Sequence, residues 1–117
     1  MYKDFTEMPV WETAIEIAEQ VFHLTSALPR KEDYGLTSQL RRAAVSISAN
    51  IAEGFGRRGA ADKRKFYDYS RGSAFETKSL LIYGQRVKYF TPEQTAPLFQ
   101  QIEKVVHDIN KINKSLS

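Results

Sequence analysis

Apolar side chains recur at helical spacing in four separate segments of this chain. In the first segment they step by three or four residues, as one face of an α-helix does, at Trp11, Ile15, Ala18 and Phe22. Pro9 suits a helix start, and the residue before Pro29 is biased away from helical geometry. The pattern therefore predicts a helix over residues 9–28.

Two more helices are predicted in the proline-free run from Arg30 to Thr91. The second apolar stripe consists of Leu36, Leu40, Ala43, Ala44, Ile47, Ile51 and Phe55. Gly54 and Gly56 flank the last member of this stripe, and glycine is common where helices end. We therefore expect a helix over 36–56, a short basic turn, and a long helix over 60–90.

The fourth segment, over residues 92–116, has the clearest start signal. Thr91 is a good capping residue and proline is favoured at the first helical position. A heptad seam follows, with Leu98, Ile102, Val105, Ile109, Ile112 and Leu116. Pro97 leaves open a start a few residues downstream. Short connections favour antiparallel neighbours, so we predict an all-α fold, an antiparallel up-down-up-down four-helix bundle, as a single domain over residues 1–117.

The predicted third helix has two unusual features. Small residues share one stripe, at Ser70, Ser73, Thr77 and Gly84. Large apolar residues lie elsewhere on it, at Tyr67, Phe75, Leu81, Ile82 and Tyr89. The first feature predicts a close contact with another helix. The second predicts extra apolar surface and hence self-association.

Composition narrows the possible chemistry. The chain has no cysteine, which excludes disulfides, thiolate nucleophiles and cysteine-ligated zinc or iron–sulfur sites. His23 and His107 stand alone, and no Glu-x-x-His pair of a di-metal bundle occurs. We predict no catalytic residues, no metal site and no cofactor. Without an apolar spanning stretch or a secretory signal, we expect a cytoplasmic protein with no membrane association.

Positive charge is concentrated in the middle of the chain. The net charge is only +3, but eight basic residues face three acidic ones between Leu36 and Gly72. We predict nucleic-acid contacts from Arg41, Arg57, Arg58, Lys63, Arg64 and Lys65, with Phe66, Tyr67 and Tyr69 interleaved. A solvated helix end would explain the same charges, although cations at a helix N-terminus oppose the helix dipole.

A second set of polar residues follows one stripe of the predicted second and third helices: Arg42, Ser46, Asn50, Glu53, Arg71, Ser73 and Glu76. Pairing across the two helices, which would hold their register, is favoured over a ligand-binding role. Glu53 and Glu76 could also act as acid and base, but no histidine, serine dyad or metal cluster accompanies them.

Two stretches, YGLTSQLRRAAVSISANIAEGFGRR and FYDYSRGSAFE, closely resemble the four-helix-bundle proteins encoded by intervening sequences in bacterial 23S ribosomal RNA genes. The accessory variability protein of diversity-generating retroelements is similar. The likeness extends from Phe5 to about Phe90. The family motif positions are occupied by Arg42, Asn50, Glu53, Gly54, Arg71, Ser73 and Glu76. The family usually has proline where Ser48 stands, which leaves open the kink that the resemblance would place in the second helix.

The resemblance implies a cylinder-like homopentamer, a positively charged surface, RNA or DNA binding and no enzyme activity. In the retroelement relatives, the bundle partners a reverse transcriptase. Our first hypothesis is therefore a non-enzymatic, oligomeric nucleic-acid-binding module. The alternative is a structural scaffold that docks a protein partner without nucleic acid. A hydrolase or metal enzyme using Glu53 and Glu76 is the third hypothesis.

Overall fold

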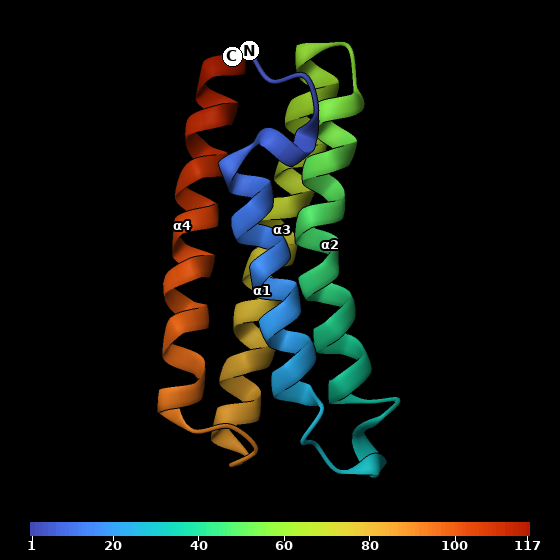
Figure 1. Ribbon diagram of the computed structural model, residues 1–117, viewed down its shortest axis with the longest axis vertical. Helices are drawn as coiled ribbons and strands as arrows, with labels where there is room; N and C mark the ends of the chain where they lie inside the picture. Colours follow the sequence, from blue (N-terminus) through green and yellow to red (C-terminus); the bar gives the residue numbers. More distant parts are fainter.

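The computed structural model describes all 117 residues and contains four long helices and no strands. Helix α1 spans Pro9–Thr25, α2 Leu36–Gly56, α3 Ala60–Arg86 and α4 Pro92–Leu116, with single 3-10 turns η1 at Phe5–Glu7 and η2 at Arg30–Glu32. Figure 1 shows that successive helices alternate in direction and that both termini lie at one end. The predicted all-α, up-down-up-down four-helix bundle is confirmed.

The core lies along the axis of the bundle, where each helix packs against its two neighbours. Its largest fully buried side chains come from all four helices and include Ile17, Leu40, Ile47, Ile51, Leu81, Leu98, Ile102 and Ile109. The heptad seam of α4 faces this core, and its last members, Ile112 and Leu116, are half-buried. No helix has an apolar stretch that is long enough to span a bilayer.

Two helices end earlier than the pattern predicts. Helix α1 ends at Thr25, three residues short, and its last turn is closed by the Thr25 hydroxyl, which donates to the Val21 carbonyl at 2.7 Å. Helix α3 ends at Arg86, four residues short. There Lys88 adopts a left-handed conformation with φ of 73°, so that the Tyr89 N–H reaches the Gly84 carbonyl at 2.8 Å. This is a Schellman ending without glycine, which the sequence does not signal.

Neither Pro97 nor Ser48, which stands where the family usually has proline, interrupts its helix. Thr91 accepts from the Gln94 N–H while the Gln94 side chain accepts from the Thr91 N–H, so α4 begins at Pro92 and contains Pro97. The downstream start does not occur. Helix α2 is continuous through Ser48, whose hydroxyl donates to the Val45 carbonyl at 3.0 Å.

Helices α2 and α3 approach each other most closely. The buried Ser70 hydroxyl donates to the Ile47 carbonyl at 2.7 Å. The Tyr67 ring lies directly over Gly54, where an added Cβ would come within 2.6 Å of the ring. The close helix contact expected from the small residues of α3 is therefore made with α2.

The Gly54 contact generates a stability prediction. We expect Gly54→Ala to lower the free energy of unfolding by about 1–3 kcal/mol, because the new methyl group overpacks against the Tyr67 ring. Gly72→Ala is the matched control, since a Cβ there meets nothing within 4 Å. It should stabilise the helix by about 0.5–1 kcal/mol. Urea unfolding followed by circular dichroism measures both, and equal effects at the two glycines would contradict the close approach.

At the end of the bundle opposite the termini, one carboxylate joins the two connections between helices. Glu32, in the connection between α1 and α2, accepts from the Leu36 N–H at 3.1 Å and from the Tyr89 hydroxyl at 2.8 Å. These hydrogen bonds, the Leu36 one first, lower the pKa of Glu32 below its ordinary value of 4.5. One side chain thus links the α1–α2 connection to the α3–α4 connection.

The lowered pKa predicts a specific acid sensitivity. Because the pKa of Glu32 is lower in the folded state than in the unfolded state, its contribution to stability is present above about pH 4.5 and is lost as the pH falls through the folded value. We expect Glu32→Gln to flatten the decline in unfolding free energy between about pH 5 and pH 3. Urea unfolding across this range tests it, with the exposed Glu103→Gln as control. An unchanged acid decline in Glu32→Gln would contradict the role of this carboxylate.

Candidate nucleic-acid interface

The candidate interface is the basic turn between α2 and α3. Helix α2 ends at Gly56, and Arg57 continues in extended conformation with φ of −81° and ψ of 150°. Gly59 precedes α3 without a side-chain cap. The turn lies at the end of the bundle that carries both termini (Figure 1).

A cluster of cations and aromatic rings forms at this turn, and we call it the turn patch: Arg57, Arg58, Lys65, Phe66 and Tyr69. The Arg57 guanidinium carbon lies 4.4 Å from the Phe66 ring centroid, and the Lys65 ammonium nitrogen lies 5.2 Å from it. Tyr69 meets Phe66 edge to face, with ring centroids 5.5 Å apart. Arg58 is exposed. The patch combines the groups that bind phosphates with those that stack on bases.

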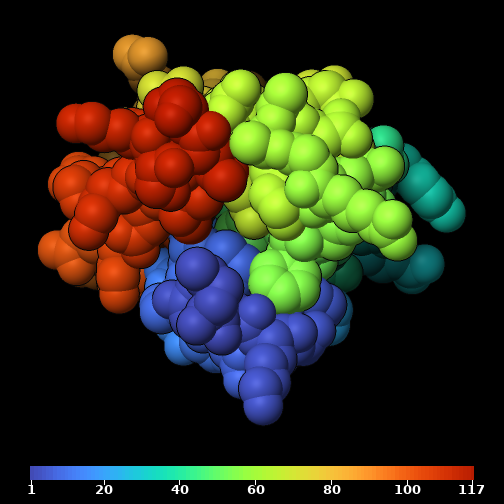
Figure 2. All heavy atoms as spheres, turned by 90° about the horizontal axis from the view of Figure 1, so that it is seen from above, coloured from blue at the N-terminus to red at the C-terminus, as the bar shows by residue number.

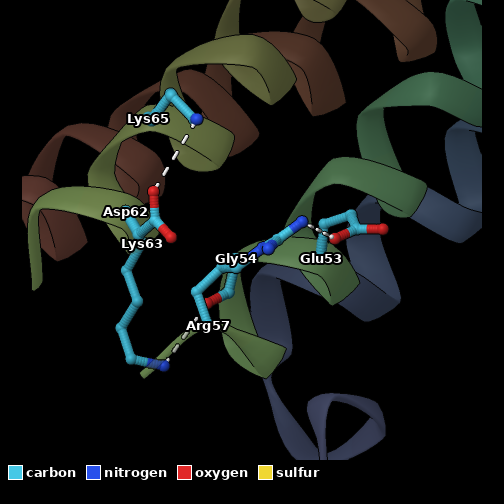
Figure 3. A network of polar contacts seen from close by, with 6 residues as sticks. All are labelled: Glu53, Gly54, Arg57, Asp62, Lys63 and Lys65. Atoms are coloured by element: carbon cyan, nitrogen blue, oxygen red, sulfur yellow. Dashed lines mark hydrogen bonds and ion pairs between the residues drawn. The ribbon is translucent and has the colours of Figure 1, made fainter. Parts of the chain in front are cut away.

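The two carboxylates beside the turn patch hold its cations loosely. Arg57 pairs with Glu53 at 2.9 Å and Lys65 with Asp62 at 3.7 Å, as Figure 3 shows. All four side chains are about half exposed. Exposed pairs within one helical turn contribute little to stability. A phosphate can therefore replace either carboxylate at small cost.

Two other predicted cations point into the fold. Lys63 donates to the carbonyls of Phe55 at 2.8 Å and Gly54 at 3.3 Å, at the end of α2. Arg64 donates to the Leu116 carbonyl at the end of α4. Both side chains are half-buried, whereas the sequence pattern had suggested that they are exposed. They cap the C-termini of neighbouring helices, where positive charge is favourable.

Arg41 lies far from the turn patch. Its guanidinium donates to the Thr25 hydroxyl at 2.8 Å and to the Phe22 carbonyl at 3.3 Å, and it covers the Phe22 ring at 4.4 Å. It lies fifteen residues before Gly56, where α2 ends next to Arg57, or about 22 Å along the helix axis. Arg41 therefore closes the end of α1 and shares no surface with the other five predicted cations.

The predicted polar pairing across α2 and α3 is mostly absent. Only Ser46 and Ser73 meet, with their hydroxyl oxygens 2.9 Å apart. Asn50 donates back to Ser46 within α2, at 2.9 Å. The charged members lie on the surface, where Arg42 donates to Ser38 on its own helix and Arg71 lies over Phe75 at 5.2 Å. Glu76 is exposed and Glu53 pairs with Arg57, so the expected cross-helix ion pairs are not formed.

The two carboxylates considered for acid–base chemistry do not come together. Glu76 stands one turn beyond Ser73 on α3, and Glu53 stands two turns beyond Ser46 on the antiparallel α2. Since Ser46 faces Ser73, the carboxylates lie about 15 Å apart along the bundle. The two-carboxylate mechanisms of glycosidases, for example, use separations of about 5–9.5 Å.

Sequence reasoning missed how the aromatic residues of α3 divide. Tyr67 and Leu81, expected on a second apolar surface, are buried in the core, whereas Phe75 and Ile82 are exposed. A second heptad row lies beside α2, and we call it the α3 seam: Phe66, Tyr69, Ser73, Glu76, Leu80, Tyr83 and Val87. Tyr69, Tyr83 and Val87 are 52%, 54% and 42% exposed. Spacing could have revealed this row, but Ser73 and Glu76 interrupt its apolar character.

Comparison with known proteins identifies the family. The model of the 23S rRNA-intervening sequence protein family matches residues 6–111. A crystal structure of a protein with unknown function from the S23 ribosomal protein family of Bacteroides thetaiotaomicron is similar, with a TM-score of 0.64 and 25% identity over 92% of this chain and 94% of that one. A comparison with curated proteins found no match. Because the family match covers nearly the whole bundle, this chain belongs to the 23S rRNA-intervening sequence protein family.

Proposed function

We propose that this chain is a non-enzymatic, oligomeric module that binds RNA or DNA through the turn patch. The observation that carries the proposal is the pair of half-buried Phe66 and exposed Tyr69, with Arg57 and Lys65 against the Phe66 ring. Cations gain affinity by releasing counterions from phosphates, and exposed aromatic rings stack on unpaired bases without regard to sequence. The expected ligand is therefore a nucleic acid with accessible single-stranded positions.

Other features support the proposal less directly. The family name links members to 23S rRNA genes. The separation of Glu53 from Glu76 favours a binding role over hydrolysis. A homopentamer, as the family resemblance implies, would present several turn patches to one nucleic acid in the cytoplasm, the compartment expected from the sequence, and multivalency amplifies weak sites.

The nucleic-acid role predicts the effect of a charge-removing variant. We expect the triple substitution Arg57→Ala, Arg58→Ala and Lys65→Ala to weaken binding of a fluorescent single-stranded RNA at least tenfold at low salt. The slope of log affinity against log salt concentration should fall by up to about 2 for single strands, because three phosphate contacts are lost. Fluorescence anisotropy at two salt concentrations measures both quantities.

A matched control separates a local site from general charge. The triple substitution Arg30→Ala, Lys31→Ala and Arg86→Ala removes three exposed cations at the opposite end of the bundle. Binding should change less than twofold. Equal losses in the two triple variants would mean that net charge alone attracts RNA. Undiminished binding in the turn-patch variant at physiological salt would end the proposal.

The α3 seam favours helix docking as a second role. An exposed heptad row is the arrangement by which one helix packs against another. In the oligomeric module, a second copy of the chain uses the part of this row around Tyr83 and Val87, and Phe66 and Tyr69 stay free in the turn patch. In the alternative scaffold, a helix of a protein partner, such as a reverse transcriptase in the retroelement relatives, uses it instead.

Oligomer mass distinguishes the two occupants. We expect light scattering to give five times the 13.4 kDa of one chain. Tyr83→Glu with Val87→Glu should reduce this to a single chain, because charges would be buried unpaired at the subunit contact. Gln100→Glu, on the exposed side of α4, is the control and should keep the full mass. An oligomer that survives the seam substitutions would leave the seam free for a protein partner, and a monomeric wild-type chain would contradict the oligomeric part of the proposal.

A further inference from the structure

A cavity of about 750 Å³ lies at the end of the bundle that carries both termini. Its walls are mainly apolar and include Met8, Val10, Phe55, Tyr67, Ile112 and Leu116. Figure 2 looks onto this end, where the N-terminal residues, the α2–α3 turn and the end of α4 surround a recess. The volume and the mostly apolar lining are typical of small-molecule sites.

The hydroxyl group of Tyr67 lies at this cavity and has no hydrogen-bond partner within the chain. Tyr67 is only 4% exposed and makes no hydrogen bond through its hydroxyl group. Among side-chain nitrogen and oxygen atoms, Thr37 Oγ1 and Asn113 Oδ1 are those that both lack a hydrogen-bond partner and are closed off from solvent. The Tyr67 oxygen lacks a partner but is not one of these atoms, so it is accessible from the cavity that Tyr67 lines. Burial raises the pKa of Tyr67 above its ordinary value of 10.0, so its hydroxyl, protonated at neutral pH like that of any tyrosine, is a donor there. The hydroxyl is therefore free to donate to a molecule in the cavity.

An ammonium group stands at the same cavity. Lys63 lines it and uses two of its three donor positions on the Gly54 and Phe55 carbonyls. The third donor is available. Lys111 also lines the cavity, while Asp108 is the one acidic residue there. The charged side chains of the lining sum to a single positive charge, and Met1 at the rim adds its α-amino group, so the cavity suits an anionic head group.

We propose that this cavity binds an apolar monocarboxylate, such as a medium-chain fatty acid. Its carboxylate accepts hydrogen bonds from the Tyr67 hydroxyl and the Lys63 ammonium, and its tail lies against the apolar walls. Charge-assisted hydrogen bonds are the strong ones, and the site supplies two donors within a largely apolar recess. The proposal is independent of nucleic-acid binding, because Tyr67 and Lys63 face inward and the turn patch faces outward.

Calorimetric titration with decanoate, below its micelle concentration, tests the site on the full chain. We expect saturable binding with one decanoate per chain, and an affinity gain of up to about fourfold per methylene group from octanoate to decanoate. Decanol and decylammonium carry the same tail without the carboxylate and should bind at least tenfold more weakly. Non-saturating heat, or equal binding of all three compounds, would overturn the proposal.

Matched tyrosine variants test the donor. Tyr67→Phe keeps the ring over Gly54 and removes the hydroxyl, so we expect decanoate affinity to fall about tenfold, as for loss of one hydrogen bond to a charged group. Tyr69→Phe removes an exposed hydroxyl outside the cavity and should change affinity less than twofold. Ile112→Trp, which narrows the cavity, should abolish binding while circular dichroism remains helical. Decanoate affinity that is the same in wild type, Tyr67→Phe and Ile112→Trp would place binding elsewhere and refute the site.

Discussion

The close approach of α2 and α3 depends on a few small residues, and much of the rest of the structure follows from it. With no side chain at Gly54, the Tyr67 ring fits against α2, and the Ser70 hydroxyl reaches the Ile47 carbonyl of the neighbouring backbone. A buried hydroxyl bonded to main chain fixes the register of two helices, because any slip would leave it unpaired. This register brings Phe66 beside Arg57, turns the α3 seam outward, and leaves the Tyr67 hydroxyl at the cavity.

Alternation of the helices explains a charge distribution that is unfavourable within α3 alone. Lys63, Arg64 and Lys65 lie in the first turns of α3, where the helix dipole disfavours cations. The C-termini of α2 and α4 lie at the same end, so their free carbonyls accept hydrogen bonds from Lys63 and Arg64. Arg41 does the same for the end of α1. Half of the six predicted nucleic-acid cations are thus used in closing the ends of neighbouring helices, and the turn patch retains the rest.

The number of helices, their order and most of their bounds could be predicted because local signals mark them. The capping residues of α4, the glycines in the last turn of α2 and the heptad spacing of the core each act within a few residues. The end of α3 carries no such signal, since Lys88 takes a left-handed conformation that glycine normally occupies. Packing of Phe90 against Gly84 accompanies that conformation, and this contact exists only once the chain has turned.

The sequence by itself determined the fold class, the basic segment and the family, since periodicity, charge and motif are properties of the chain taken in order. Only the tertiary structure decided which cations remain free, because that depends on carbonyls of helices distant in sequence. It also placed Tyr67 inside and Tyr69 outside, although only one residue separates them, since a helix turns about 200° over two positions. The charged residues expected to pair across α2 and α3 lie on the surface instead, because two small hydroxyl groups already fill the contact between those helices.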